Sequence, residues 1–307
     1  MVKSELSVID SRYFRRNFAA IFLRVEGDEA VVIETGTSRS APLVLSALGE
    51  RGIQPRQVRY VVVTHAHLDH AAGAAALMDA FPEAKLVAHP RAARHLIEPS
   101  RLEASARQVY GDAEFERLYG KLVPVPTERV LQVEDGAAIP FGSGKLTALH
   151  TRGHAKHHFC VLDPLADAVF TGDAFGLAYP ELQSGWLFVF PTTSPTDFEG
   201  GEALAAVDRI VGCGAGRAML THFGALPRPA EAREQLRGHI AFSMEIAEEA
   251  RVLEEGRRQD FLLGKLRERY AAAIALGPAG FLDTDLALNA AGLAWSVREK
   301  SDRDRPT

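Results

Sequence analysis

The segment Val61–Gly73, VVVTHAHLDHAAG, places three histidines and one aspartate directly after an apolar run. His65 and His67 are two residues apart, and in an extended segment such side chains point the same way, so both can reach one ion. Asp69 and His70 open an Ala-rich segment, where the dipole of a helix would favour a carboxylate. Because neighbouring residues at a helix start diverge, this second pair is available to a second ion. Imidazole and carboxylate groups suit zinc, iron or manganese.

Three further residues of ligand type follow strand-like runs in the second half of the chain. They are His154 after KLTALHTRG, Asp173 after AVFTG and His222 after AMLT. If these strands share a sheet, their ends meet at one edge, and loops on such a scaffold commonly carry the chemistry. Seven ligands are too many for one four-coordinate ion, whereas two ions sharing Asp173 would use them all and leave positions for water. Because none of the seven is a cysteine, a structural thiolate zinc site is not expected.

The elements that must position these residues alternate between strand and helix in the first part of the chain. The expected order is two strands over 19–36, a helix over 41–53, a strand over 58–65, a helix over 71–82, a strand over 84–90 and helical segments over 91–120. This order predicts a layered α/β arrangement. A strand-rich half follows, interrupted by a helix over about 195–211. From about residue 229 onward we expect helices alone, over roughly 229–256, 258–276 and 281–299.

Composition limits the classes of function. The 307 residues carry a net charge of −5 and no long block of lysine or arginine, which disfavours nucleic acid as a partner. No apolar run reaches the roughly 18 residues that a membrane span needs, so no membrane partner is expected. The N-terminal segment lacks the pattern of a signal peptide, and the two cysteines lie far apart. We therefore expect a cytoplasmic protein with reduced thiols.

The ordered pattern His65-x-His67-x-Asp69-His70, followed by His154, Asp173 and His222, resembles that of the metallo-β-lactamase superfamily. The resemblance extends over about residues 18–225 and includes IETG, GHAKHH and FTGD, the last ending at Asp173. It implies a four-layer αββα sandwich with the metals at one edge. We accordingly expect a catalytic domain over residues 1–228 and a C-terminal helical extension over residues 229–307.

The resemblance also implies a role for each ligand. The first ion would be held by His65, His67 and His154, the second by Asp69, His70 and His222, with Asp173 bridging the two. Two divalent ions are implied, zinc first, with iron or manganese as alternatives. Glu34 stands where the family often has aspartate and would support the metal-binding loops from behind the ligands; His158 would have a similar supporting or structural role.

The activity implied is hydrolysis, with a hydroxide that bridges the two metals as the nucleophile. Asp69 would orient that hydroxide and accept its proton. The negative net charge disfavours nuclease activity, and the absence of a signal-peptide pattern disfavours a secreted antibiotic-degrading enzyme. The favoured function is therefore hydrolysis of a small ester, lactone or thioester. Two alternatives stay open: a mononuclear iron persulfide dioxygenase, and a regulatory protein that keeps its metals with only vestigial hydrolysis.

Substrate contacts are expected in the aromatic segment after Asp173. Phe175, Tyr179 and Phe190 are candidates for lining an apolar acyl pocket, although ordinary core packing explains such residues equally well. The C-terminal helices carry apolar stripes that must be buried, either as a lid over the site or as a dimer interface. We expect a homodimer that acts on a small molecule.

Overall fold

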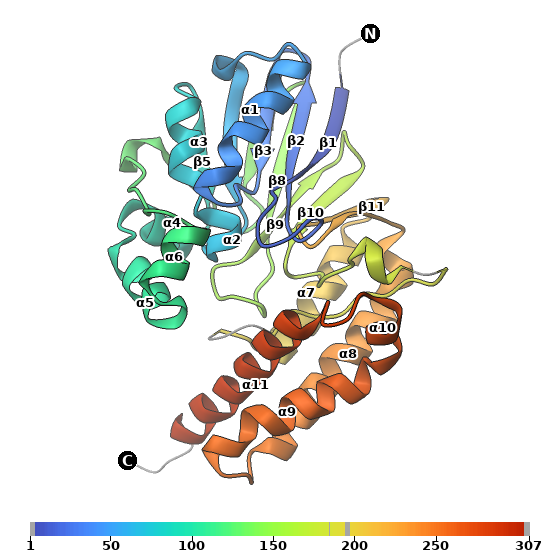
Figure 1. Ribbon diagram of the computed structural model, residues 1–307. Helices are drawn as coiled ribbons and strands as arrows, with labels where there is room; N and C mark the ends of the chain where they lie inside the picture. Colours follow the sequence, from blue (N-terminus) through green and yellow to red (C-terminus); the bar gives the residue numbers. More distant parts are fainter. Residues whose placement is uncertain (1–3, 184, 194–196, 304–307) are drawn as a thin grey trace. The chain divides into compact units, whose positions relative to one another are not determined.

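The computed structural model describes residues 4–183, 185–193 and 197–303, which form two compact units (Figure 1). Unit 1 consists of residues 1–150, 157–172 and 215–227, and unit 2 consists of residues 151–156, 173–214 and 228–307. The predicted functional division at residue 228 stays a prediction. The units described below are defined by their internal contacts.

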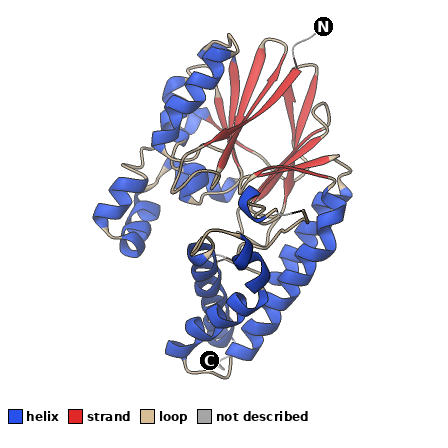
Figure 2. Cartoon of the chain, turned by 45° about the vertical axis from the view of Figure 1, so that its right-hand side comes forward, coloured by secondary structure: helices blue, strands red, loops and turns tan. Residues whose placement is uncertain are grey.

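Unit 1 contains two six-stranded sheets. The first has the order β1-β2-β3-β4-β5-β6, with bounds Ser4–Asp10, Ala20–Glu26, Glu29–Ile33, Val58–Val63, Lys85–Ala88 and Val130–Gln132. The second has the order β12-β11-β10-β9-β8-β7; from β7 to β12 the bounds are Ala138–Phe141, Gly144–His150, Phe159–Asp163, Ala168–Gly172, Arg217–Leu220 and Gly224–Pro227. Figure 2 shows the two sheets facing each other. The α/β fold class is confirmed.

The helices divide between the units. Unit 1 holds α1 (Ala41–Glu50), α2 (Leu68–Ala71), α3 (Ala74–Ala80), α4 (Pro90–Ile97), α5 (Ser100–Tyr110) and α6 (Asp112–Leu118). Unit 2 holds α7 (Gly200–Gly212), α8 (Pro229–Ala250), α9 (Glu255–Arg269), α10 (Ala271–Leu276) and α11 (Asp283–Arg303).

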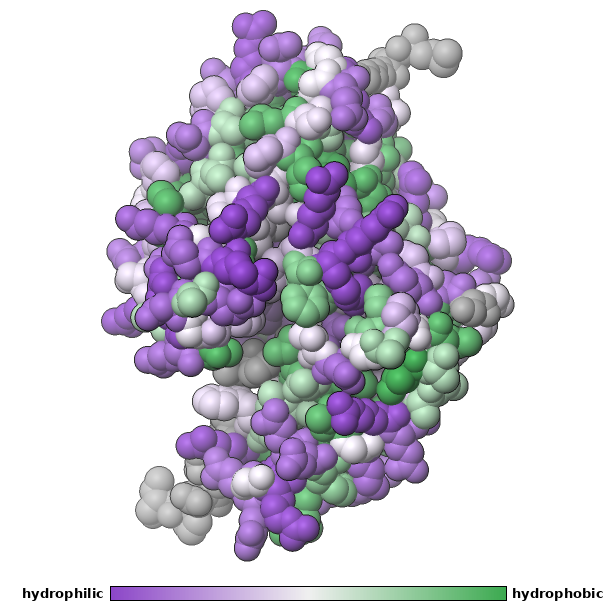
Figure 3. Space-filling model, viewed as in Figure 1, coloured by the Kyte–Doolittle hydropathy of each residue, from purple (hydrophilic) through white to green (hydrophobic). Residues whose placement is uncertain are grey.

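No helix within the described ranges is long and apolar enough to cross a bilayer. On the face drawn in Figure 3, hydrophilic residues lie over much of the surface with hydrophobic ones between them.

Two hydrophobic layers explain why β2 is apolar along most of its length. Phe22 points between the sheets, where its ring centroid lies 5.3 Å from that of Phe170. Ile21 and Leu23, on the other face of the strand, pack against the helices of unit 1. A strand buried on both faces reads as a continuous apolar run. The same alternation places Val61 and Val63 of β4 toward the helices, which fixes where the chain leaves the sheet.

A buried ion pair connects the two sheets. Arg24 of β2 is 1% exposed, and its Nε donates to Oδ2 of Asp163 on β9 at 2.8 Å. Its Nη2 donates to Oε2 of Glu26 at 2.6 Å. Removing Asp163 would leave Arg24 paired with Glu26, but its buried Nε would lose its acceptor.

We therefore expect Asp163→Ala to lower the free energy of unfolding by about 1–3 kcal/mol. Urea denaturation followed by circular dichroism measures this change. Asp167→Ala removes an aspartate from the turn after β9. Its free energy of unfolding shows how much stability is lost when an aspartate of this region is removed without changing the contact with Arg24. A loss below about 1 kcal/mol, the range of exposed ion pairs, would contradict the role given to Arg24.

Three of the predicted helices differ from the sequence predictions. The predicted helix over 71–82 is divided at Gly73, because its amide donates outside the helix, to the carbonyl oxygen of Gly36 at 3.0 Å. The residue is a glycine because a Cβ there would lie 2.4 Å from the carbonyl oxygen of Thr35. The helix expected from about residue 195 begins at Gly200, where the Glu199 carboxylate accepts hydrogen bonds from the first turn. The helix predicted over 258–276 is divided at Tyr270.

Candidate metal centre

One edge of unit 1 gathers five of the seven predicted ligands. β4 ends at Val63 and delivers His65 and His67, while β11 ends at Leu220 and delivers His222. Asp69 and His70 lie on the short helix α2, which begins one residue after His67. The side chains of His65, His70 and His222 are buried, whereas His67 and Asp69 are partly exposed.

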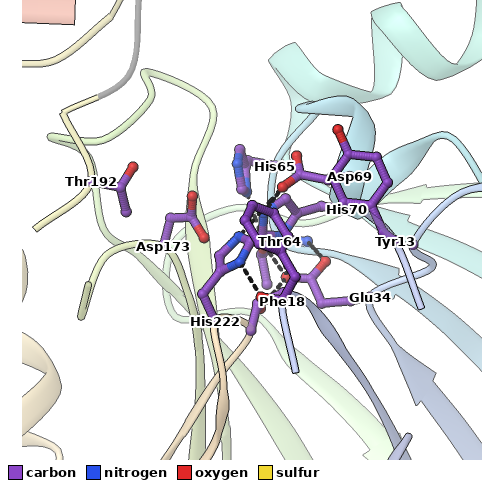
Figure 4. A network of polar contacts seen from close by, with 12 residues as sticks. Tyr13, Phe18, Glu34, Thr64, His65, Asp69, His70, Asp173, Thr192 and His222 are labelled. Carbon is purple, nitrogen blue, oxygen red and sulfur yellow. Dashed lines mark hydrogen bonds and ion pairs between the residues drawn. The ribbon is translucent and has the colours of Figure 1, made fainter. Parts of the chain in front are cut away.

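Asp69, His70 and His222 converge on a single point (Figure 4). Oδ2 of Asp69 lies 3.6 Å from Nε2 of His70 and 3.4 Å from Nε2 of His222. Ligand atoms about 2.1 Å from a tetrahedral ion are separated from one another by about 3.4 Å. The donor set therefore fits a zinc-type ion with a fourth position open.

Hydrogen bonds on the opposite ring nitrogens turn the Nε2 atoms toward that point. Nδ1 of His222 lies 2.6 Å from the carbonyl oxygen of Phe18, which can only accept. Nδ1 of His70 lies 3.1 Å from Oε1 of Glu34. Each contact places the proton on Nδ1 and leaves Nε2 with a lone pair for a metal.

Glu34 is the hub of this network. Its backbone lies in the left-handed region at φ +66, and its side chain is buried. Besides His70, its Oε1 accepts hydrogen bonds from Oγ1 of Thr64 at 2.6 Å and from Oγ1 of Thr221 at 3.1 Å. Because the hydroxyl hydrogen of Thr64 is donated to Glu34, the hydroxyl oxygen is the acceptor for Nδ1 of His65, 3.1 Å away. One carboxylate thus orients histidines that are predicted to serve different ions.

Glu34 is also close enough to His65 and His70 to be considered a ligand itself. Its Oε1 already receives three donors, and Oε2 lies 3.4 Å from the amide nitrogen of Thr64. An oxygen occupied in this way has little capacity left for a metal. We therefore assign Glu34 to holding the ligands in place, the role that the resemblance implies.

The two remaining predicted ligands lie in unit 2, where they are neighbours. Nε2 of His154 is 3.3 Å from Oδ2 of Asp173, and both side chains are buried. Nδ1 of His154 lies 2.8 Å from Oγ1 of Thr192. The pair thus has the spacing of two ligands on one ion. Its sharing of ions with the residues of unit 1 stays a prediction.

The other predicted residues lie in the following places. His158 is fully buried in unit 1, with its ring centroid 5.0 Å from that of His65. Tyr179 is buried in unit 2, and its hydroxyl donates to Oδ1 of Asp285 on α11 at 2.9 Å. Phe175 and Phe190 are also fully buried there. The proposed contact of these three aromatic residues with a substrate stays a prediction.

Sequence reasoning missed the two threonines that bind Glu34. Each directly precedes a ligand, in the repeated dipeptides Thr64-His65 and Thr221-His222. A hydroxyl placed one residue before a metal-binding histidine, at two separate strand ends, is the signal that identifies them.

Sequence reasoning also missed a cluster of tyrosines beside Asp69. The hydroxyls of Tyr13 and Tyr119 are 2.5 Å apart, and their rings stack with centroids 5.7 Å apart. The Tyr110 ring meets that of Tyr119 edge to face at 5.5 Å. Burial raises the pKa of each of these phenols, and the Asp69 carboxylate raises it further. All three therefore keep their protons at neutral pH.

Comparison with known proteins places this geometry in a family context. Residues 17–222 match the model of the metallo-beta-lactamase superfamily. A metallo-beta-lactamase fold-containing protein of Sulfurisphaera tokodaii is 31% identical over 140 residues, which cover 44% of this chain and 49% of the relative. The chain thus matches about half the length of that protein. The crystal structure of the same archaeal protein superposes with a TM-score of 0.60, covering 75% of this chain and 85% of that one at 25% identity.

Two further proteins are also similar to the chain. An acyl-coenzyme A thioesterase of Gallus gallus is 28% identical over 202 residues, covering 62% of this chain and 68% of the relative. A metallo-beta-lactamase family protein of Thermus thermophilus shares the fold, with a TM-score of 0.64 over 96% of this chain and 94% of that one at 19% identity.

Proposed function

Because the chain belongs to the metallo-β-lactamase superfamily, we propose that it is a metal-dependent hydrolase of a small thioester, ester or lactone. The observation that carries the proposal is the convergence of Asp69, His70 and His222 at 3.4 and 3.6 Å with their Nδ1 atoms fixed from behind. A thioester is the first choice of substrate, supported by the similarity to the acyl-coenzyme A thioesterase.

The proposed centre takes two divalent ions, zinc first. One would be held by His65, His67 and His154, the other by Asp69, His70 and His222, with Asp173 shared. When bound, such ions lower the pKa of water to near neutrality and polarise the acyl carbonyl group. Imidazole and carboxylate donors without thiolates fit a catalytic site that keeps a position open.

The chain's own residues then have distinct tasks. Asp69 is partly exposed, unlike the buried histidines beside it, so its second oxygen is placed to orient an attacking water and accept its proton. Glu34 keeps the imidazole rings aligned through Thr64 and directly through Nδ1 of His70. The burial of His65 and His70 limits competing water around the ligands.

A hydrolysis screen tests this function. Protein loaded separately with zinc, manganese or iron is assayed with acyl-coenzyme A thioesters of two to sixteen carbons, N-acyl homoserine lactones and bis(p-nitrophenyl) phosphate. We expect thioester hydrolysis to exceed phosphodiester hydrolysis by at least about 10²-fold in kcat/KM, as expected when a site is complementary to one transition state. A preference for the phosphodiester, or oxygen-dependent sulfite formation from glutathione persulfide by the iron form, would overturn it.

A further inference from the structure

The loop between β1 and β2 is held in one conformation by the last residue of β1. Oδ1 of Asp10 accepts from the amide of Arg12 at 2.9 Å, and Oδ2 accepts from the amide of Asn17 at 3.0 Å. The amide of Ser11 donates to the carbonyl oxygen of Ala19 at 2.9 Å, which closes the loop. These bonds fix the path of the chain from residue 10 to residue 19.

Three residues of this loop have a left-handed backbone; one is Asn17 at φ +55, and the other two adjoin a single side chain. Arg12 has φ +56 and Phe14 has φ +59, and they flank Tyr13 on both sides. A non-glycine residue in this region is strained and persists only where its surroundings determine it, commonly at functional sites. The residue between these two, Tyr13, stacks its ring on that of Tyr119 with the centroids 5.7 Å apart.

The surroundings of Tyr13 confirm that placement. Figure 4 shows the Tyr13 ring next to Asp69, with the hydroxyl and the carboxylate on the same side. Tyr119 is 1% exposed, whereas Tyr13 is only half-buried. Of the two side chains, that of Tyr13 is thus the one that is in part exposed to solvent. When the Tyr119 hydroxyl donates to the Tyr13 oxygen across the 2.5 Å contact, the hydroxyl hydrogen of Tyr13 can be donated to another acceptor.

We propose that Tyr13 donates a hydrogen bond to the carbonyl oxygen of the acyl group that is cleaved, and that Tyr119 is a positioning residue which aligns it. The inference rests on the proposed hydrolytic function. As the nucleophile bonds to the acyl carbon, the π pair moves onto the carbonyl oxygen, and it returns when the carbon–sulfur bond breaks and the thiolate leaves. A donor fixed in advance stabilises the charge that develops on that oxygen.

The test is a cycle of Tyr13→Phe, Tyr119→Phe and the double variant, assayed with the best acyl-coenzyme A substrate. We expect Tyr13→Phe to lower kcat by about 10²-fold, as for the loss of one oxyanion donor, with KM changed less than about threefold. Tyr119→Phe lowers kcat less, and the double variant is no slower than Tyr13→Phe, because Tyr119 acts through Tyr13. Metal content and melting temperature are measured for each variant.

A matched control is Tyr60→Phe, which removes a hydroxyl from β4 and is expected to retain wild-type kcat. A kcat for Tyr13→Phe within twofold of wild type would overturn the proposal. The proposal would also be overturned if the effects of the two single substitutions on kcat multiply in the double variant, or if the loss of kcat follows a loss of metal.

A second readout keeps the inference separate from the proposed function. If the wild-type protein hydrolyses no thioester, the proposed function fails, and binding of octanoate to the metal-loaded protein is measured by calorimetry. Octanoate offers the same carboxyl oxygen as the product. We then expect Tyr13→Phe to bind octanoate about tenfold more weakly, the loss of one hydrogen bond to a charged group. Equal affinities, or no binding by the wild-type protein, would overturn the role of Tyr13.

Discussion

Glu34→Gln is expected to weaken metal binding by about 10- to 100-fold, the usual effect of removing a group that orients metal-binding histidines. Three hydrogen-bond donors meet at Oε1 of Glu34, from Thr64, Thr221 and His70. If the glutamine NH₂ group takes that position, it cannot accept the hydrogen bonds of these donors, because it is a donor itself. If its carbonyl oxygen does, the negative charge is still lost. Both outcomes loosen His65 and His70 together, so we expect the affinity for both ions to fall.

Competition with a chromophoric zinc chelator measures this affinity. Glu50→Gln, which neutralises an exposed carboxylate at the end of α1, is the matched control and is expected to bind zinc like the wild type. Glu34→Asp keeps the charge and is expected to lose less affinity than Glu34→Gln. If Glu34→Gln loses one ion and keeps the other at full affinity, Glu34 is acting on one side of the site only.

Asp69→Ala is expected to lower kcat by about 10³-fold, within the range for loss of a general base. The substitution removes the oxygen that lies 3.4 Å from His222 and 3.6 Å from His70, and with it the group placed to accept a proton. Kinetics at saturating zinc separate the loss of chemistry from a loss of metal. Asp112→Ala, at the exposed start of α6, is the control and is expected to retain full activity.

The same variant tests whether catalysis is the role of the protein. In cells that depend on the protein, we expect Asp69→Ala to behave like the deletion. If the cellular phenotype survives the loss of turnover, the protein acts through binding and the hydrolase account is contradicted.

The sequence predicts where the candidate ligands lie, because they follow apolar strands; that they bind metal stays a prediction. β4 and β11 are short apolar strands, and the residues that follow them must emerge at a sheet end. His65 and His222 are therefore candidates by residue type and by position after a strand. The sequence SELSVID of β1 carries no comparable pattern, since polar residues interrupt its apolar positions, and this strand was missed.

The parts that could not be predicted depend on contacts distant in sequence. Thr221 meets Glu34 across 187 positions, and Tyr13 meets Tyr119 across 106. Neither contact is marked by a periodic pattern in the sequence. The left-handed backbone at Arg12 and Phe14 is equally hidden, because neither residue type favours that region. A carboxylate at position 34 was expected to support the metal loops, but its partners emerged only from the fold.

The number of ions bound by the intact chain tests the central claim most directly. The protein is stripped of metal, loaded with excess zinc, desalted and analysed by inductively coupled plasma mass spectrometry alongside the His70→Ala variant. We predict two zinc ions per wild-type chain and a loss of one from the variant, because His70 is assigned to a single ion. One ion or fewer in the fully loaded wild-type protein would contradict the two-metal centre.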